Sequence, residues 1–519
     1  MPPGSTTSTS DNVNNSRPPI YLIERLREHA RAIPGNIAIR APGGALTFAQ
    51  LAERAEHIAG RLRVHGCRPG DRVAIIGKPS LEWIEVLIGA AFARLAFAPI
   101  STMLTTEEHH RLLADARPAV IFADGEIVDA GSCSPDITIR LGALDEWMRS
   151  GPVAGEPQAS HADDLFSIIY SSGTTGVPKG IAHTVAGRMD FVRARQRPSL
   201  GPGKFSYVST SLYTNLSFLG IVSPLYWGAG IIVPERFTPG DFLRSCREDG
   251  ITDVGLVPVQ VRRILDHPEF APDALASLEF TMISGSPIDL AVKRRLIECW
   301  PGKISDGYGS TETGGIAMLD LKAHPDKLDT VGPIMAGVEV RILDEDGVPL
   351  PQGEIGEIAA GTPLPMEGYF NRKDLTEGTM WADSSGSRFI KTGDTGYLGE
   401  DGFLRITGRS RDMIISGGLN IFAIDIEEAL LTHPAVLEVA VIAVPSEQWG
   451  ESPHAIVVLK QGVRATGDEL TARIATRLSR TSWPVGYSFV DELPRNALGK
   501  VLKRELREPF WAGRERDVA

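Results

Sequence analysis

A loop rich in glycine and hydroxyl side chains gives the first indication of chemistry. The segment YSSGTTGVPKG, residues 170–180, combines three glycines with two serines, two threonines and Lys179. Glycines let backbone N–H groups approach phosphate oxygens, hydroxyls add donors, and the lysine adds charge. The segment fails the P-loop pattern, because Pro178 stands where the second glycine is required and Gly180 follows the lysine. It is therefore either a mobile surface loop or the phosphate loop of another nucleotide-binding class.

A second cluster, SDGYGSTETGG, occupies residues 305–315. Tyr308 has a ring that can stack on a base, and the hydroxyl of Thr311 can donate to a phosphate. Glu312 is a hard oxygen ligand of the kind that Mg²⁺ takes, in small number, together with substrate phosphates. The alternative is a glycine-rich turn with a solvated glutamate.

A third segment, residues 389–422, carries Asp394 and Arg409. The carboxylate can accept hydrogen bonds from ribose hydroxyls, and the guanidinium can bind ribose or phosphate. Gly417 and Gly418 permit close backbone approach. The alternative is an ordinary hairpin with an exposed acid and arginine. Lys500 follows a glycine near the C-terminus, where a single lysine is usually only surface charge.

The elements that position these residues read first as alternating strands and helices. A capping box from Thr47 to Gln50 begins a helix that ends near Gly66. A strand is predicted over 71–77 and a helix over 80–95. Further apolar strands are predicted over 119–124, 164–170, 228–235, 253–258 and 280–285. Buried β-branched runs separated by helices indicate parallel sheets covered on both faces.

The pattern changes after residue 332, where residues 337–361 and 401–408 predict antiparallel hairpins with Asp-Gly turns. A block of just over a hundred residues follows, long enough to form its own domain. In it, helices are predicted over 424–433 and 468–479, and strands over 437–445, 454–460 and 487–493. We therefore divide the chain into a disordered tail (1–18), a large N-terminal domain (19–410) and a small C-terminal domain (411–519).

Composition narrows the functional class. The chain has 519 residues, of which 42% are hydrophobic, and 53 basic against 65 acidic residues give a net charge of −12. This charge repels nucleic acid and anionic membrane. The N-terminus lacks an apolar leader, and Glu85 and Arg94 interrupt the longest apolar run. Four cysteines without CxxC spacing argue against a zinc site or a disulfide framework and fit a cytoplasmic location.

The blocks described above, in this order and spacing, closely resemble the adenylate-forming superfamily. This superfamily contains acyl- and aryl-CoA ligases, firefly-type luciferases and peptide-synthetase adenylation domains. The matching motifs are the phosphate loop, YGSTE at 308–312, TGD at 392–394, GRSRD at 408–412 and PRNALGK at 494–500. The likeness runs from about residue 21 to residue 506 and is greatest to stand-alone acid–CoA ligases.

The resemblance implies a fold and a reaction. The fold is α/β: two parallel-rich αβαβα sheets and a small β-barrel-like subdomain, hinged to a small mobile α+β C-terminal domain. The reaction uses ATP, Mg²⁺ and CoA. A carboxylate attacks the α-phosphate of ATP to give an acyl-adenylate and pyrophosphate, and a thiol then displaces AMP.

The resemblance also implies roles for individual residues. Lys500 would neutralise charge during adenylate formation, Thr311 would bind the α-phosphate and Glu312 would hold Mg²⁺. Arg411 would be the hinge, and the loop at Gly417 and Gly418 would line the thiol tunnel. The implied ATP- and AMP-binding set is Ser171, Thr174, Thr175, Gly176, Lys179, Ser284, Gly285, Ser286, Asp306, Gly307, Tyr308, Gly309, Thr311, Asp394, Arg409 and Lys500.

The acyl pocket departs from the family pattern. Thr214 replaces a histidine that is common after an aromatic residue, here Tyr213, and Val185 replaces another common histidine. The stretch has no acid that could pair with an α-ammonium group, so an α-amino acid is disfavoured. Asn215 favours an aryl or hydroxyaryl acid as substrate, and a medium-chain acid is the alternative substrate. The alternative role of Asn215 itself is that of an ordinary turn amide. The implied pocket residues are Tyr213, Thr214, Asn215, Val259 and Gly314.

Three functions stay open at this point. The first is a stand-alone acid–CoA ligase. The second is adenylation with another acceptor: a carrier-protein thiol, an amine, or nitrite-dependent diazotisation of an aryl amine. The third is a binding or regulatory protein that has lost catalysis, against which the complete set of charged motif residues argues. The sequence does not define the oligomeric state.

Overall fold

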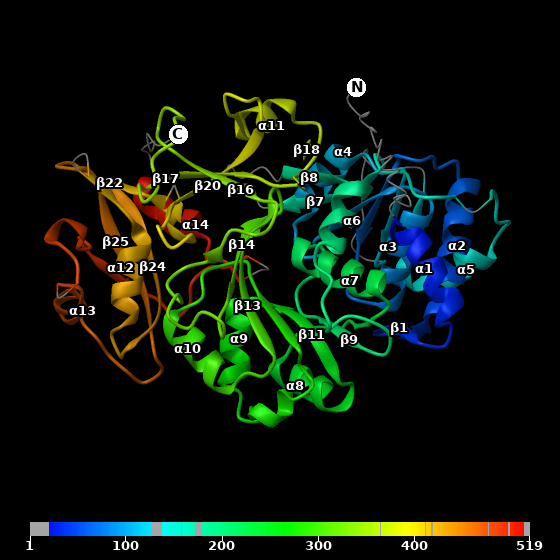
Figure 1. Ribbon diagram of the computed structural model, residues 1–519, viewed down its shortest axis with the longest axis horizontal. Helices are drawn as coiled ribbons and strands as arrows, with labels where there is room; N and C mark the ends of the chain where they lie inside the picture. Colours follow the sequence, from blue (N-terminus) through cyan, green and yellow to red (C-terminus); the bar gives the residue numbers. More distant parts are fainter. Residues whose placement is uncertain are drawn as a thin grey trace, which may run out of the picture.

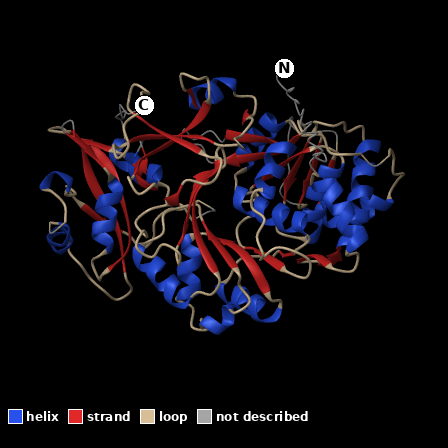
Figure 2. Cartoon of the chain, viewed as in Figure 1, coloured by secondary structure: helices blue, strands red, loops and turns tan. Residues whose placement is uncertain are grey.

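The chain folds into four β-sheets flanked by helices (Figures 1 and 2). The structure, a computed structural model, describes residues 20–125, 137–156, 158–171, 179–363, 365–409, 412–416, 419–475, 477–496 and 499–512. No helix within these ranges is both long and apolar enough to cross a membrane.

The first sheet, on the right of Figure 1, has seven strands and is mainly parallel. Its strand order is β18 (Gly368–Tyr369), β8 (Lys179–Thr184), β7 (Leu165–Ser171), β4 (Ala96–Ile100), β3 (Arg72–Ile76), β5 (Val120–Ala123) and β6 (Thr138–Arg140). The first two strands of this order run antiparallel to their neighbours. Since β18 is the most distant in sequence, this edge joins residues near 180 to residues near 369.

The second sheet has eight strands, and its core is also parallel. Its strand order is β14 (Gly314–Asp320), β13 (Lys303–Ser310), β12 (Phe280–Ile283), β11 (Ile251–Leu256), β9 (Phe205–Val208), β10 (Gly230–Ile232), β1 (Ile37–Ala41) and β2 (Gly44–Thr47). One edge is the antiparallel β13–β14 hairpin, which contains the YGSTE motif.

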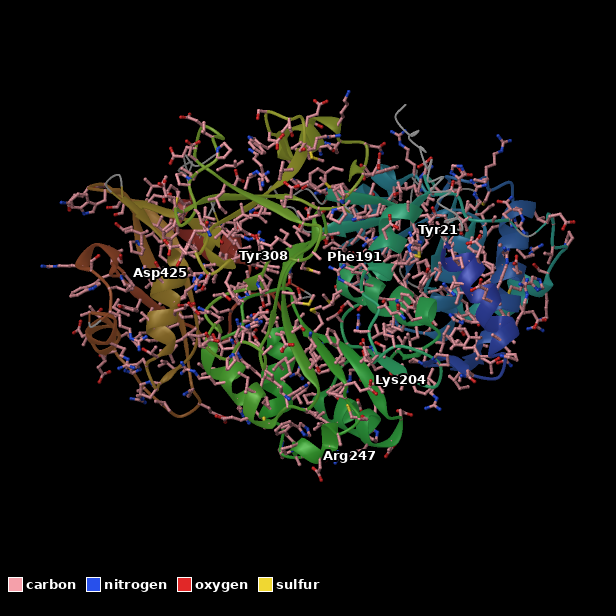
Figure 3. All side chains as sticks on the ribbon, viewed as in Figure 1. Tyr21, Phe191, Lys204, Arg247, Tyr308 and Asp425 are labelled. Carbon is pink, nitrogen blue, oxygen red and sulfur yellow. The ribbon has the colours of Figure 1, made fainter. Side chains whose placement is uncertain are left out.

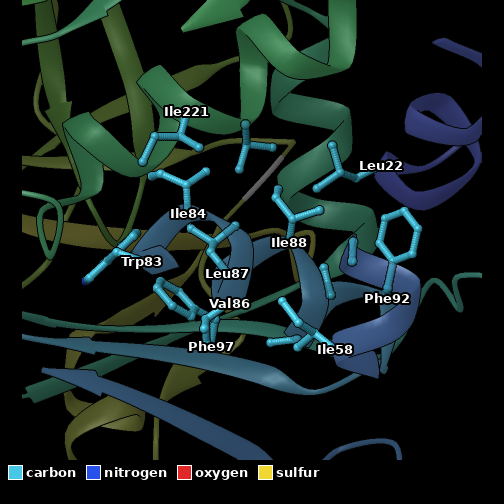
Figure 4. Close-up of a cluster of buried hydrophobic side chains, with 14 of the residues drawn as sticks. Leu22, Ile58, Trp83, Ile84, Val86, Leu87, Ile88, Phe92, Phe97 and Ile221 are labelled. Carbon is cyan, nitrogen blue, oxygen red and sulfur yellow. The ribbon is translucent and has the colours of Figure 1, made fainter. Parts of the chain in front are cut away.

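Helices cover both sheets, and one core lies between them. The helices of this part are α1 (Leu22–Ala32), α2 (Phe48–Val64), α3 (Leu81–Phe92), α4 (Thr106–Ala116), α5 (Leu144–Arg149), α6 (Val185–Arg193), α7 (Asn215–Trp227), α8 (Pro239–Glu248), α9 (Pro258–Leu265) and α10 (Leu290–Cys299). Helix α3 is buried from Trp83 to Phe92, because it packs on α2 and on strands of both sheets (Figure 4). Glu85 within it pairs with Arg54.

The third and fourth sheets are mainly antiparallel. The third contains β15 (Gly332–Pro333), β21 (Phe403–Arg409), β20 (Arg388–Leu398), β17 (Gly356–Gly361), β16 (Glu339–Leu343) and β19 (Met380–Ala382), with α11 (Lys373–Thr379) nearby. The fourth contains β23 (Leu419–Ile421), β22 (Ile414–Ser416), β25 (Gly450–Leu459), β24 (Val436–Ser446) and β26 (Tyr487–Phe489), with α12 (Ala423–Leu431), α13 (Gly467–Ile474) and α14 (Lys503–Trp511).

This architecture confirms the predicted fold class: parallel-rich sheets in a large N-terminal part and a small C-terminal α+β part. The capping box at Thr47 is present and begins α2. Two elements of the C-terminal block differ from the prediction. The helix predicted over 468–479 is the shorter α13, and the strand predicted over 487–493 is the shorter β26. The boundaries at residues 18 and 410 stay predictions.

Candidate active site

The β13–β14 hairpin brings Thr311 and Glu312 to a tight turn. Ser310 pairs with Gly314 across the hairpin, and the hydroxyls of Ser310 and Thr313 accept backbone N–H groups within the turn. A Cβ atom at Gly309 would collide with the Gly314 carbonyl, so glycine is needed there for the strands to approach. The turn therefore holds a hydroxyl and a carboxylate in fixed positions.

Glu312 is linked to the phosphate-loop lysine through Tyr369, a residue that the sequence reading missed. The Tyr369 hydroxyl donates to Glu312 Oε1 at 3.1 Å, and Lys179 Nζ lies 4.9 Å from the centre of the tyrosine ring. Strand pairing causes this, because Tyr369 is opposite Ile181 on the edge strand β18. Only the long-range pairing reveals it.

Tyr308, Asp394 and Arg409, three residues of the predicted ATP-binding set, form a second cluster. The Tyr308 hydroxyl donates to Asp394 Oδ2 at 2.9 Å, and Arg409 Nε lies 3.0 Å from Asp394 Oδ1. Asp394 and Arg409 are paired residues of β20 and β21. Burial, followed by the nearby Asp394 charge, raises the pKa of Tyr308 well above its ordinary value, so the hydroxyl stays a donor.

Asp306, two residues before Tyr308 on β13, forms a buried ion pair. Its Oδ2 lies 2.8 Å from Nζ of Lys293 on α10, and burial raises the pKa of Asp306 although the lysine opposes the shift. The inclusion of Asp306 in the ATP- and AMP-binding set stays a prediction. The Ser284 hydroxyl donates to the Gly307 carbonyl, and this hydrogen bond joins the 284–286 loop to β13. Gly285 in the loop has φ +100°.

A buried chain of hydrogen bonds connects the predicted acyl pocket to the hairpin turn. Arg188 Nη1 donates to Asn215 Oδ1 at 2.7 Å, and its Nη2 lies 3.1 Å from His183 Nδ1. The other histidine nitrogen donates to the Thr311 carbonyl at 2.9 Å. Burial, and then the charge of Arg188, lowers the pKa of His183 well below its ordinary value, so the ring is neutral and fits this donor–acceptor order.

The unusual Thr214 has a structural role. It is the N-cap of α7: its hydroxyl accepts from the Ser217 N–H at 3.3 Å and is hydrogen-bonded to Thr210. Asn215 is therefore the first residue of the helix, and the half-buried Tyr213 directly precedes the cap. Threonine thus fixes the direction in which α7 begins.

The C-terminal lysine turn packs against the N-terminal part. The Gly499 N–H donates to the Asn496 carbonyl, and the Lys500 N–H donates to Asn496 Oδ1. A Cβ atom at Gly499 would lie only 2.7 Å from Cγ1 of Val259 on α9. Lys500 is therefore brought next to a residue of the predicted acyl pocket.

Glu438 of β24 connects this turn to α9 a second time. Its Oε1 lies 2.8 Å from Arg495 and 3.8 Å from Arg262 of α9. Arg495 also donates to the Gly499 carbonyl at 2.5 Å. One carboxylate thus holds both the turn and the neighbouring helix.

Several predicted residues cannot be placed. Thr174, Thr175, Gly176, Arg411, Gly417 and Gly418 lie outside the described residues, as does the side chain of Ser171. Gly314 is placed in the hairpin, with φ +70°.

The donor set fits a metal bound mainly through substrate. Within the described ranges, no three His, Cys, Asp or Glu side chains gather around one point. Glu312 instead offers a carboxylate beside Lys179. This arrangement suits Mg²⁺, which binds through one or two carboxylates plus substrate phosphates rather than in an all-protein cage.

Comparison with known proteins gives matches along nearly the whole chain. The AMP-binding enzyme family matches residues 26–370, and the AMP-binding enzyme C-terminal domain matches residues 425–500. A fatty acid–[acyl-carrier-protein] ligase of Streptomyces coeruleorubidus is 31% identical, covering 96% of this chain and 98% of that protein. A feruloyl-CoA synthase of an Amycolatopsis species is 32% identical, covering 93% and 97%. The o-succinylbenzoate coenzyme A synthetase of Bacillus subtilis, in complex with ATP and a magnesium ion, superposes with a TM-score of 0.83 at 28% identity, covering 93% and 98%.

Proposed function

This chain belongs to the AMP-binding enzyme family and is an acid–thiol ligase, and we propose that it converts an aryl or medium-chain carboxylic acid to its CoA thioester. In the first step a carboxylate oxygen bonds to the α-phosphorus of ATP, and the bond from that phosphorus to the β-phosphate oxygen breaks. In the second step a CoA thiolate, whose proton goes to solvent, bonds to the acyl carbon and AMP leaves.

The packing of the Gly499–Lys500 turn on Val259 carries this proposal. An anion must attack a polyanion in the first step, so the main requirement is a cation at the reacting oxygens. The turn belongs to the C-terminal part and contacts α9, and no local interaction along the chain requires this contact. Its position supports a role for Lys500 in neutralising charge during adenylate formation.

The rest of the site would bind ATP. Lys179 and Glu312 would hold the β- and γ-phosphates and their Mg²⁺, with Tyr369 fixing the carboxylate. Asp394 and Arg409 would take the ribose. The ion supplies charge neutralisation at the phosphates when bound; Glu312 supplies a ligand whose direction is fixed by its hydrogen bond to Tyr369.

The feruloyl-CoA synthase supports an aryl acid and CoA as acceptor. The carrier-protein ligase, similar over the same length, supports a second candidate in which the acceptor is a carrier-protein thiol. Asn215 and Val259 would border the acyl group in either case, because the acceptor arrives only in the second step.

Release of AMP tests the proposal. A broad panel of aryl and aliphatic acids is incubated with MgATP, with and without CoA, and with a carrier protein bearing a phosphopantetheine thiol. CoA-dependent AMP release with an aryl or medium-chain acid supports the proposal, and release that requires the carrier supports the second candidate. Absence of AMP and pyrophosphate release with every acid overturns both.

Lys500→Ala separates the two steps. Removing a charge about 4 Å from the reacting oxygens costs about 4 kcal/mol at a dielectric constant of 20, which corresponds to roughly a thousandfold slower adenylate formation. Thioester formation from supplied acyl-adenylate should change by less than about threefold. Unchanged ATP–pyrophosphate exchange in this variant would remove Lys500 from its assigned role.

A further inference from the structure

Arg195 follows α6 and places its guanidinium beside the β13–β14 hairpin. A Cβ atom at Gly315 would lie 2.5 Å from Nη2 of Arg195 and 3.0 Å from Sδ of Met335. Gly315 follows the predicted pocket residue Gly314 and is three residues beyond Glu312. Three residues of chain span at most about 10 Å, which is comparable to the length of an aryl acid. The guanidinium therefore lies about one substrate length from Glu312 in the hairpin turn.

The cation has no acidic partner. Among the described residues no carboxylate lies within ion-pair distance of Arg195, and its only hydrogen bonds there are weak: 3.5 Å to the Phe191 carbonyl, and 3.6 Å to Met335 Sδ, a weak thioether acceptor. The half-buried side chain is desolvated, which lowers the pKa of Arg195 to about 10. The buried Arg188, which also has no acid partner, makes short hydrogen bonds to Asn215 and His183, whereas Arg195 has only the two weak contacts.

A neighbouring arginine shows what an ordinary buried pair looks like here. Arg197, two residues further, makes two hydrogen bonds of 2.6 and 2.9 Å to the buried Asp253. The fold thus neutralises Arg197 from within and leaves Arg195, which faces the hairpin, without such a partner. The difference indicates that the partner of Arg195 comes from outside the chain.

The orientation of Arg195 fits recognition of a planar anion. Its Cζ lies over the Phe191 ring, 3.4 Å from the ring centre, so the guanidinium stacks on the ring. Phe191 lies near the centre of the view in Figure 3. Stacking uses the face of the guanidinium, and the contacts to Phe191 and Met335 use two of its five N–H groups, which leaves the other three for an acceptor in the same plane. A carboxylate matches that edge with two parallel hydrogen bonds.

We propose that Arg195 binds a second carboxylate at the far end of the acid, so that the preferred substrates are aryl diacids. This inference rests on the proposed function, because it assigns the acid that enters the same site. The first carboxylate reacts at the hairpin turn, and the second is held by Arg195 on Phe191. The same cation would disfavour acids that carry a distal ammonium group.

The test compares acids that differ only at the far end. Benzoic and cinnamic acids bearing a distal carboxylate, hydroxyl, methyl or aminomethyl group are assayed for AMP release with the full chain. The wild type should prefer the carboxylate over the methyl group by at least about tenfold in kcat/KM, the size expected for hydrogen bonds to a charged group. Arg195→Met should remove this preference mainly through KM, while kcat/KM for the methyl acid changes by less than about twofold. Arg195→Lys should keep part of the preference.

Arg193→Met is the matched control. Arg193 is two residues away and pairs with Asp190, so its loss changes net charge by the same amount. Thermal unfolding of each variant shows whether the chain has folded. If Arg195→Met is unstable, the Arg195→Lys variant tests the inference, because lysine keeps the charge but cannot make two parallel hydrogen bonds to a carboxylate.

A wild type that releases AMP but does not prefer the diacid, or an Arg195→Met variant with the same preference, overturns the inference and leaves the proposed function standing. No AMP release with any acid overturns both.

Discussion

Gly499→Ala should slow adenylate formation without slowing thioester formation. Gly499 has φ +74°, where any other residue is strained by about 1–2 kcal/mol. The added methyl would also stand 2.7 Å from Val259 Cγ1, about 1 Å closer than a normal carbon–carbon contact. Overpacking of this kind costs about 1–3 kcal/mol.

The two costs act differently on the reaction. Strain in the turn is present wherever the C-terminal part lies, whereas the collision with Val259 exists only when the turn is docked on α9. The collision should therefore lower the rate of ATP–pyrophosphate exchange by roughly 5- to 150-fold. Conversion of supplied acyl-adenylate to thioester should fall by less than about threefold.

Two further variants complete the experiment. Gly462→Ala adds a methyl at φ +75° with no atom within 4 Å, so it reports strain alone and should leave both half-reactions nearly unchanged. Val259→Ala combined with Gly499→Ala removes the collision and should restore most of the exchange rate relative to Val259→Ala alone. The reasoning is refuted if the double variant shows no recovery, or if both half-reactions of Gly499→Ala fall together.

Three other residues give shorter predictions. His183 is buried with a pKa far below its ordinary value, so the unfolded chain binds a proton below pH 6.5 that the folded chain does not. The free energy of unfolding should therefore fall by up to about 1.4 kcal/mol per pH unit below pH 6.5. Urea titrations at several pH values should show that the unfolding free energy of His183→Gln depends less on pH over that range. Glu312→Gln should raise the Mg²⁺ concentration needed for half-maximal AMP release by at least about tenfold, since a charged ligand becomes neutral. Tyr369→Phe, which removes only one hydrogen bond to that carboxylate, should change the same value by less than about tenfold, for a loss of about 0.5–1.5 kcal/mol.

Local sequence determined much of the fold. The capping box at Thr47 and the apolar spacing after it specify α2 because both act within a few residues. The β-branched runs likewise specify buried strands, whereas their parallel pairing joins segments far apart in the chain. Motif residues such as Tyr308, Asp394 and Arg409 were identified from type and spacing, and they do come together.

The tertiary structure alone decided which distant residues meet. Tyr369 reaches Glu312 because β18 pairs with β8 across nearly two hundred residues, and nothing near Tyr369 in sequence signals that pairing. Arg195 and Arg197 are indistinguishable as sequence, yet Asp253 neutralises one and no described acid neutralises the other. The Gly499–Lys500 motif likewise says nothing of Val259, whose contact arises when the C-terminal part packs on α9. Spacing along the chain fixes local geometry, whereas the partner of a charge is set by where the whole fold places it.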